Sequence, residues 1–151
     1  MSVSTVDDFW ERVFPCVASK AVVRDPTLAA RINEYAYELR RFLALACESR
    51  DPLAMISPRI DSLWHEFVNH TIIYREYCQC VAGRFLDHMP RSEWFPIPDS
   101  AVRNFLDAYE ARFRTLPDVW FHGLDSVVES ELVAGRIPAG LQWSGYVPDA
   151  G

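Results

Sequence analysis

The sequence predicts an all-α fold, with about four main helices in a single helical domain over residues 1–151. Two observations support this prediction. Apolar residues recur every three or four positions over long stretches, which is the periodicity of an amphipathic helix. Two of these stretches begin with a capping residue followed by proline, at Asp25-Pro26 and Ser57-Pro58, a common helix start. The chain has 151 residues, half of them hydrophobic, and is long enough to bury one core.

Two helices are predicted in the first third of the chain. The first runs from Thr5 to about Val17, and the second begins at the Asp25 cap and runs to about Cys47. The second helix has one apolar face, made by Leu28, Ile32, Tyr35, Leu39, Phe42, Leu43 and Ala46. Its charged residues are expected on the opposite side: Arg31, Glu34, Glu38 and Arg41.

A central helix is predicted over residues 58–82, and Gly83 is expected to end it. One side of this helix is an uninterrupted apolar stripe. The other side mixes apolar residues with the ionisable side chains of Asp61, His65 and Arg75. A helix with apolar residues on both sides is expected at the centre of its domain, with its polar side chains packed against another element.

The C-terminal half is predicted to be less regular. An irregular, proline-rich loop is expected over residues 84–100, followed by a fourth helix over about 101–114. A short helix is expected near residues 124–134. The tail over about 136–151 contains glycine and proline and is expected to be coil-like and flexible.

Charge and composition exclude several classes of function. The formal net charge is −6, which argues against a general nucleic-acid or anionic-membrane binder. The N-terminus lacks the basic and apolar segments of a signal peptide. No run approaches the roughly eighteen apolar residues that a membrane span requires. The four cysteines are expected to be thiols in a reducing compartment. The sequence therefore predicts a cytoplasmic protein.

Five residues form a candidate polar cluster: Asp61, His65, Arg75, Asp87 and His88. Asp61 and His65 lie four apart on one helix, so their side chains are expected to be neighbours. His88 follows the end of that helix and is expected to fold back toward it. Two histidines and an acid are a plausible shell for one zinc or iron ion. Asp61, His65 and His88 are therefore the candidate metal ligands.

A structural role is the alternative for the same residues. A buried histidine bonded to an aspartate one turn away is more often a structural pair than a ligand set. Arg75 is expected to pair with an acid on its face or to hold an anionic ligand. The string from His65 to His70 is not a zinc-protease motif, because that motif places its two histidines four apart and here they are five apart.

Four motifs occur in a fixed order: Arg40-Arg41-Phe42-Leu43-x-Leu45, Ser57-Pro58-x-x-Asp61-x-x-Trp64-His65-x-Phe67, Tyr74-x-x-Tyr77-Cys78 and Gly83-Arg84-Phe85-Leu86-x-His88-x-Pro90. Over about residues 34–120, this order resembles the short bacterial members of the glycine-rich domain-containing protein-like family. The resemblance implies a shared fold and no settled reaction. This chain has Asp87 before His88 where the family usually has a second histidine.

Two functions are compatible with these observations. The first is a small binding or accessory module with a protein or peptide partner, because no complete catalytic signature is present. The alternative is a metal-dependent enzyme, with zinc or non-haem iron, that acts on a small molecule or peptide. In that enzyme Tyr74, Tyr77 or Glu66 would transfer protons. The sequence does not indicate the oligomeric state.

Overall fold

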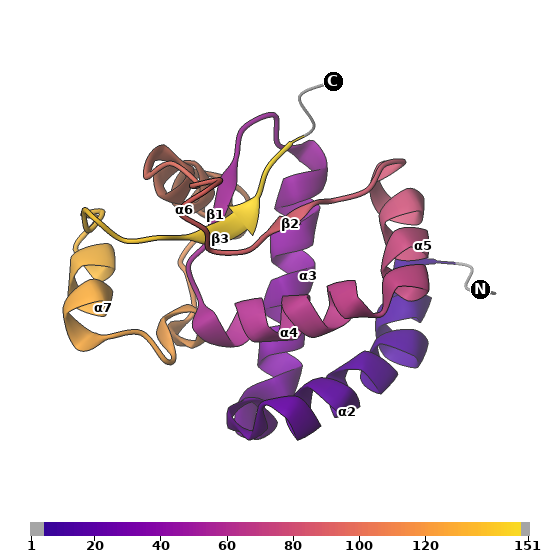
Figure 1. Ribbon diagram of the computed structural model, residues 1–151. Coiled ribbons are helices and arrows are strands. Elements are labelled where there is room, and N and C mark those ends of the chain that lie inside the picture. The colour runs from indigo at the N-terminus through magenta and orange to yellow at the C-terminus, as the bar shows by residue number, and fades with distance from the viewer. Residues whose placement is uncertain (1–4, 149–151) are drawn as a thin grey trace.

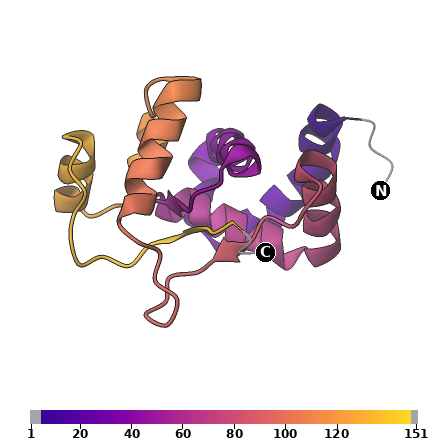
Figure 2. The same ribbon diagram turned by 90° about the horizontal axis from the view of Figure 1, so that it is seen from above.

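The computed structural model describes residues 5–148, which are mostly helical and include a small three-stranded antiparallel sheet (Figure 1). The all-α prediction is therefore right about the predominance of helices and wrong about the absence of strands. Helix α3, Ile32–Glu48, runs through the middle of the molecule and contacts elements from both halves of the chain. Figure 2 shows it between the N-terminal helices on one side and the later helices on the other.

The N-terminal segment is helical throughout and extends beyond the predicted end at Val17. It consists of α1 (Val6–Asp8), the π-helical η1 (Phe9–Val13) and α2 (Phe14–Arg24). The Phe14 N–H bonds to the Phe9 carbonyl five residues back, which is the π-helical pattern. Pro15 follows directly and has no N–H to donate, so the regular α-helical ladder is interrupted here.

The second predicted helix is present and is preceded by a 3₁₀ segment. Helix η2, Pro26–Arg31, leads directly into α3. The predicted cap is confirmed, because the Thr27 N–H donates to Asp25 Oδ1 at 3.2 Å. Helix α3 is amphipathic, and its apolar face packs into the core at Tyr35, Leu39 and Phe42.

The predicted central helix over residues 58–82 is wrong as one element. It is two helices, α4 (Pro58–Asn69) and α5 (Thr71–Ala82), which meet at a sharp bend at His70 (Figure 1). The bend brings the rings of Phe67 and Tyr74 to 4.8 Å, edge to face. In one straight helix these residues would be about 10 Å apart along the axis. The rings of Phe67 and Tyr74 can therefore pack against each other because the helix is interrupted between them.

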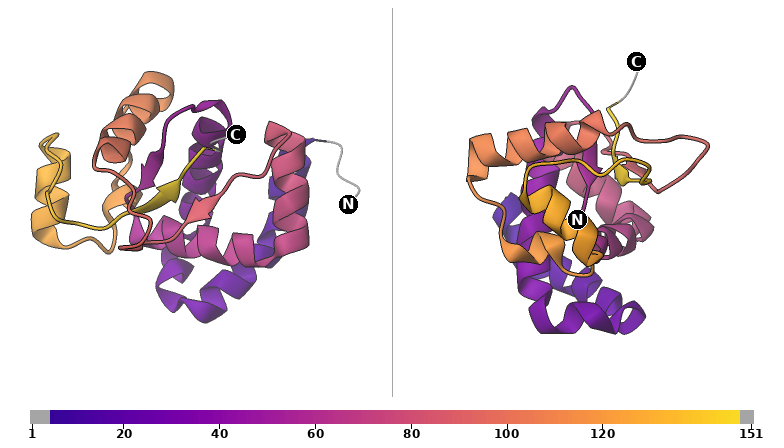
Figure 3. Two further views of the ribbon diagram at one scale, coloured as in Figure 1. Left: turned by 45° about the horizontal axis from the view of Figure 1, so that its top comes forward. Right: turned by 90° about the vertical axis from the view of Figure 1, so that its left-hand side faces the viewer.

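The sheet consists of three short strands from distant parts of the chain. Strand β3, Ser144–Tyr146, lies between β1 (Leu53–Met55) and β2 (His88–Met89) and is antiparallel to both. Figure 3 shows this arrangement, with the C-terminal segment as the middle strand. Gly145 is required there, because a Cβ atom would lie 2.2 Å from the Leu53 carbonyl oxygen.

The tail over 136–151 therefore contains regular structure, contrary to the prediction of a coil. Its strand is buried, and Tyr146 accepts a hydrogen bond from Arg84 Nη1 at 2.6 Å. The other guanidinium nitrogen of Arg84 donates to the carbonyls of Ala46 and Cys47 at the end of α3. The end of the predicted tail, residues 149–151, lies outside the described residues.

The remaining elements are close to the prediction. They are α6 (Ser100–Phe113), η3 (Asp118–Phe121) and α7 (Ser126–Val133). The predicted proline-rich loop over 84–100 contains β2, and its second part projects from the body (Figure 2). Trp94 and Phe95 are exposed on that projection. Within residues 5–148, no helix has both the length and the hydropathy of a membrane span.

Candidate functional site

The predicted polar cluster forms around one pair, Asp61 and His88. Asp61 lies in the first turn of α4, and His88 begins strand β2. His88 Nε2 lies 3.0 Å from Asp61 Oδ1, and the His88 side chain is only 6% exposed. The imidazole also packs edge to face on Trp64, with ring centroids 4.4 Å apart. The predicted return of His88 to this helix is therefore confirmed, and the contact attaches β2 to α4.

Of the other three members of the predicted cluster, His65 lies beside the pair. His65 is exposed on α4, and its ring centroid is 5.9 Å from that of His88. Arg75 is exposed on α5, beyond the bend at His70, so it does not share a helix face with Asp61. Asp87 is half-buried beside Cys78 and contributes to the raised pKa of that thiol, whose largest cause is burial.

The expected metal shell of Asp61, His65 and His88 is not assembled. Among residues 5–148, no group of three or more His, Cys, Asp or Glu side chains is placed to hold a metal ion. Asp61 and His88 are hydrogen-bonded to each other, while the exposed His65 ring lies beside them, with its centroid 5.9 Å from that of His88. Asp61 and His88 could at most supply two ligands.

A buried hydrogen-bond relay lies next to this pair. Trp64 Nε1 donates to the Tyr74 hydroxyl at 3.1 Å, and that hydroxyl donates to the Leu86 carbonyl at 2.6 Å. Burial raises the pKa of Tyr74 well above its usual value. The phenol therefore stays protonated at neutral pH and connects α4, α5 and the segment before β2. This arrangement supports a structural role for Tyr74 rather than proton transfer.

The structure contains a buried carboxylate that the sequence analysis missed. Glu38 was expected on the outer side of α3, but it is only 3% exposed. Its Oε1 accepts hydrogen bonds from the Tyr109 hydroxyl and from Trp120 Nε1, the latter at 2.8 Å. Arg41 Nη1 lies 3.6 Å from Oε2. Tyr109 and Trp120 come from α6 and η3, so no local pattern around residue 38 could have indicated them.

A second buried acid is Glu66 on α4. His70 Nε2 lies 3.2 Å from its Oε1, and Arg24 Nε lies 3.0 Å from its Oε2. The arginine comes from the end of α2, so this ion pair joins α2 to the bend between α4 and α5. Both carboxylate oxygens have partners, which again favours a structural role.

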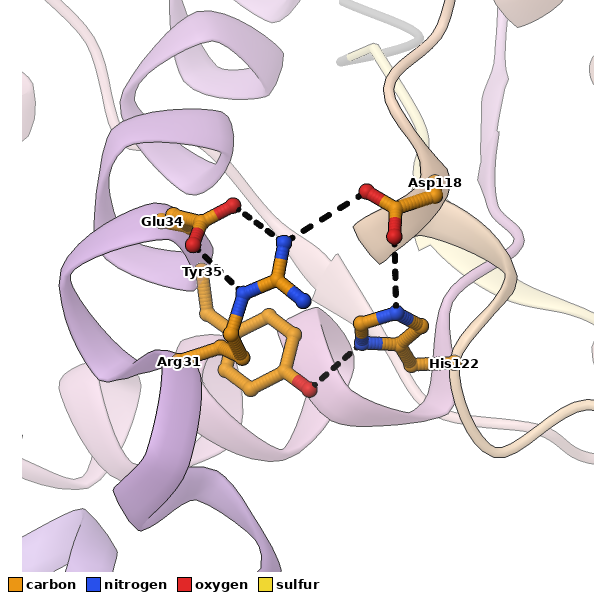
Figure 4. A network of polar contacts seen from close by, with 5 residues as sticks. All are labelled: Arg31, Glu34, Tyr35, Asp118 and His122. Atoms are coloured by element: carbon orange, nitrogen blue, oxygen red, sulfur yellow. Dashed lines mark hydrogen bonds and ion pairs between the residues drawn. The ribbon is translucent and has the colours of Figure 1, made fainter.

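The polar network in Figure 4 connects α3 with η3. Arg31 lies between the carboxylates of Glu34 and Asp118, with Nη2 at 2.6 Å and 3.5 Å from their oxygens. His122 lies between Asp118 and Tyr35: its Nε2 is 3.3 Å from Asp118 Oδ2 and its Nδ1 is 2.9 Å from the Tyr35 hydroxyl. A Tyr-His-Asp chain can transfer protons, but here both ring nitrogens have partners and neither faces an open site. The network is therefore structural.

Two adjacent grooves along α3 could hold a ligand, as could a groove of about 460 Å³ beside β1, α7 and the segment that leads into β3. The first lies between α2 and the η2–α3 segment and has a volume of about 640 Å³. Most of its lining is apolar: Trp10, Phe14, Pro15, Ala18, Val22, Ala29, Ile32 and Ala36. Its polar side chains are Ser19, Asn33, Tyr37 and Arg40. An apolar concavity with few polar groups is the usual composition of a ligand site.

The second groove lies between α3, α5 and α6 and has a volume of about 650 Å³. Its lining includes Arg40, Arg41 and Arg112, together with Tyr37 and Tyr77. Tyr37 and Arg40 line both grooves, so the two are adjacent along α3. The sequence analysis missed both grooves, because each is made by helices that are distant in sequence.

Comparison with protein families gives one match. Residues 3–101, about two thirds of the chain, match the UCP032817-like family. The chain belongs to this family. Neither the curated proteins nor the solved structures contain a match. The resemblance to the glycine-rich domain-containing protein-like family stays a prediction.

The match covers some parts of the site and not others. The apolar groove and the Asp61–His88 pair lie inside the matched residues of this UCP032817-like protein. Arg112, Tyr109 and Trp120 lie beyond residue 101. The apolar groove is therefore formed entirely by the matched segment, whereas the second groove and the Glu38 network also need α6 or η3.

Proposed function

We propose that this protein is a binding module that captures an apolar, helical segment of a partner protein in the groove between α2 and α3. The observation that carries the proposal is the groove itself, with about 640 Å³ of apolar concavity. The second groove has a similar volume but is lined by three arginines, whereas most of the lining of the first groove is apolar.

The dimensions of the groove favour a helical segment. Its lining on α2 runs from Phe14 to Val22, and its lining on α3 runs from Ile32 to Arg40. Each span covers nine residues, whose first and last are about 12 Å apart along the helix, which is roughly two turns. A partner helix with apolar residues at positions i, i+3 or i+4 and i+7 presents a stripe of that length.

The residues that line the groove would also allow a partner helix to approach closely. Ala18, Ala29 and Ala36 place small side chains along the groove, while the partly exposed Trp10 supplies aromatic surface at one end. Small residues let a partner helix approach the backbone, and aromatic residues contribute strongly to interface energies. Burial of three Leu or Phe side chains would supply about 5–8 kcal/mol before the cost of association.

The test is selection of peptides from a displayed random library on three versions of the protein. The wild type is compared with Ala36→Trp, which fills the groove, and with Val23→Trp, which adds a ring at an exposed position on α2 outside the groove. The proposal expects apolar-rich peptides to be enriched on the wild type and on Val23→Trp, and not on Ala36→Trp.

A second variant that fills the groove distinguishes loss of binding from misfolding. Ser19 is exposed and lines the same groove, so Ser19→Trp fills it without crowding the core. Circular dichroism establishes that each variant keeps its helices. No enrichment on the wild type, or equal enrichment on folded Ser19→Trp, overturns the proposal.

A further inference from the structure

Resting on the proposed function, we infer that the partner segment carries acidic side chains about one helical turn beyond its apolar anchors, where the second groove binds them through Arg40 and Arg112. The apolar groove and the arginine-lined groove share Tyr37 and Arg40. A ligand that lies along α3 in the first groove can therefore extend into the second. The inference specifies the chemistry of the partner: an amphipathic helix with an apolar stripe and a carboxylate end.

The spacing follows from α3. Ala36 lines the apolar groove, and Arg40 lies four residues later, one turn further along the same face. A partner side chain over Ala36 is therefore about 6 Å along the axis from the Arg40 position. The first partner carboxylate is expected one turn after the last apolar anchor.

The second groove is rich in arginine, although the chain as a whole is acidic. The protein carries a formal net charge of −6, yet three of its arginines, Arg40, Arg41 and Arg112, line one groove of about 650 Å³. Glu48 is the one carboxylate in that lining. The nearby thiol of Cys47 adds no negative charge at neutral pH, because burial raises its pKa.

Arg41 lines the second groove, but its guanidinium is held by contacts within the protein. Its Nη1 donates to the Tyr109 hydroxyl at 3.0 Å, and its Nη2 donates to the Tyr37 hydroxyl at 3.1 Å. The guanidinium also stacks over the Tyr37 ring, with 4.5 Å to the centroid. Because Glu38 balances its charge, Arg41 positions Tyr37 between the two grooves.

Arg40 and Arg112 have partners that are easily exchanged. Arg40 pairs with Asp7, and Arg112 pairs with Glu48 at 3.0 Å. The two carboxylates are 74% and 70% exposed. Exposed ion pairs contribute little to stability, so each acid can return to water when a partner carboxylate replaces it.

The test extends the peptide selection to the double variant Arg40→Gln/Arg112→Gln, with Arg50→Gln as a control at an exposed arginine that lines neither groove. On the wild type and on Arg50→Gln, enriched peptides are expected to combine apolar residues with Asp or Glu one turn away. On the double variant, the apolar enrichment is expected to remain and the acidic enrichment to disappear. One enriched peptide, synthesised, is expected to bind the double variant about tenfold more weakly.

Salt gives an independent readout on the same peptide. Raising NaCl from about 0.05 M to about 0.5 M should weaken wild-type binding severalfold and should hardly change binding to the double variant. Apolar enrichment without acidic residues, or acidic enrichment that persists on the double variant, overturns this inference and leaves the proposed function standing. Absence of apolar enrichment overturns the proposed function instead.

Discussion

Two polar regions share helix α3 and behave in opposite ways. On one side Glu38 is buried, and Tyr109, Trp120 and Arg41 surround its carboxylate. On the other side Arg40 borders the two grooves and pairs only with an exposed acid. A buried charge must have fixed partners because water cannot solvate it. An exposed charge can exchange partners at little cost. The first region stabilises the fold, and the second is available for binding.

Glu38→Ala should have the largest effect on stability. The change leaves the Tyr109 hydroxyl and the Trp120 N–H without their acceptor in the core. We expect a loss of about 3 kcal/mol in the free energy of unfolding, measured by urea denaturation. Glu34→Ala, one turn earlier on the exposed side of α3, is the matched control and should cost less than about 0.5 kcal/mol, because its ion pair with Arg31 is exposed. Equal losses in both variants would contradict the distinction between the two regions.

Substitutions in the Asp61–His88 pair should have an intermediate effect on the free energy of unfolding. His88→Ala and Asp61→Ala should each lower the free energy of unfolding by about 1–2 kcal/mol, because the bond is partly buried. A double-mutant cycle should give a coupling energy of about 1 kcal/mol. His65→Ala is the comparison and should have a smaller effect, because His65 is exposed and its ring centroid is 5.9 Å from that of His88.

The same variants test the metal hypothesis. Mass spectrometry of the metal content, with zinc or iron supplied, should give no stoichiometric ion, because the described residues place no group of three ligand side chains to hold one. One equivalent of metal that is lost in both His65→Ala and His88→Ala would show that the three residues can converge, and would favour the metal-dependent enzyme.

Alkaline pH should lower the free energy of unfolding through the buried Tyr109. Burial, with a contribution from Glu38, raises the pKa of Tyr109 from the usual 10.0 to about 12. Between these values the folded protein keeps a proton that the unfolded chain has lost, so the free energy of unfolding should fall as the pH rises above about 10. Urea denaturation at a series of pH values measures this slope, and Tyr109→Phe should reduce it. An unchanged slope in the variant would exclude Tyr109 as the titrating group.

Arg112→Gln should have the smallest effect on stability. Its ion pair with Glu48 is exposed on both sides, so the free energy of unfolding should change by less than about 0.5 kcal/mol. The variant should nevertheless bind acidic peptides more weakly. A large loss of stability would place Arg112 with the structural region rather than with the groove.

The features that the sequence predicted correctly are local. Ser57 and Asp25 cap their helices because each side chain reaches an N–H two or three residues away. Gly83 ends α5 because its φ of 67° is a conformation that glycine adopts without strain. The approximate positions of α3 and α6 follow from apolar periodicity, which is also local.

The features that the sequence analysis missed depend on distant partners. Glu38 meets Tyr109 and Trp120 across 71 and 82 residues of sequence. The bend at His70 follows from aromatic packing and carries no proline or glycine signal. The strands have two or three residues each, which is too short for an alternating pattern to be recognised.

The candidate site shows the same division. That His88 returns to the helix carrying Asp61 was predictable, because both belong to one short stretch of chain. That Arg75 lies on a separate helix, α5, was not predictable, since the bend between α4 and α5 depends on packing.

The amino-acid sequence by itself determined the capped helix starts at Asp25 and Ser57 and the helix end at Gly83, since caps and periodicity act over a few residues. Only the tertiary structure decided which polar groups are enclosed and which remain open to a partner. The physical reason is that burial is a property of all the elements packed around a side chain. Glu38 and Arg40, two residues apart on one helix, therefore have different surroundings and different roles.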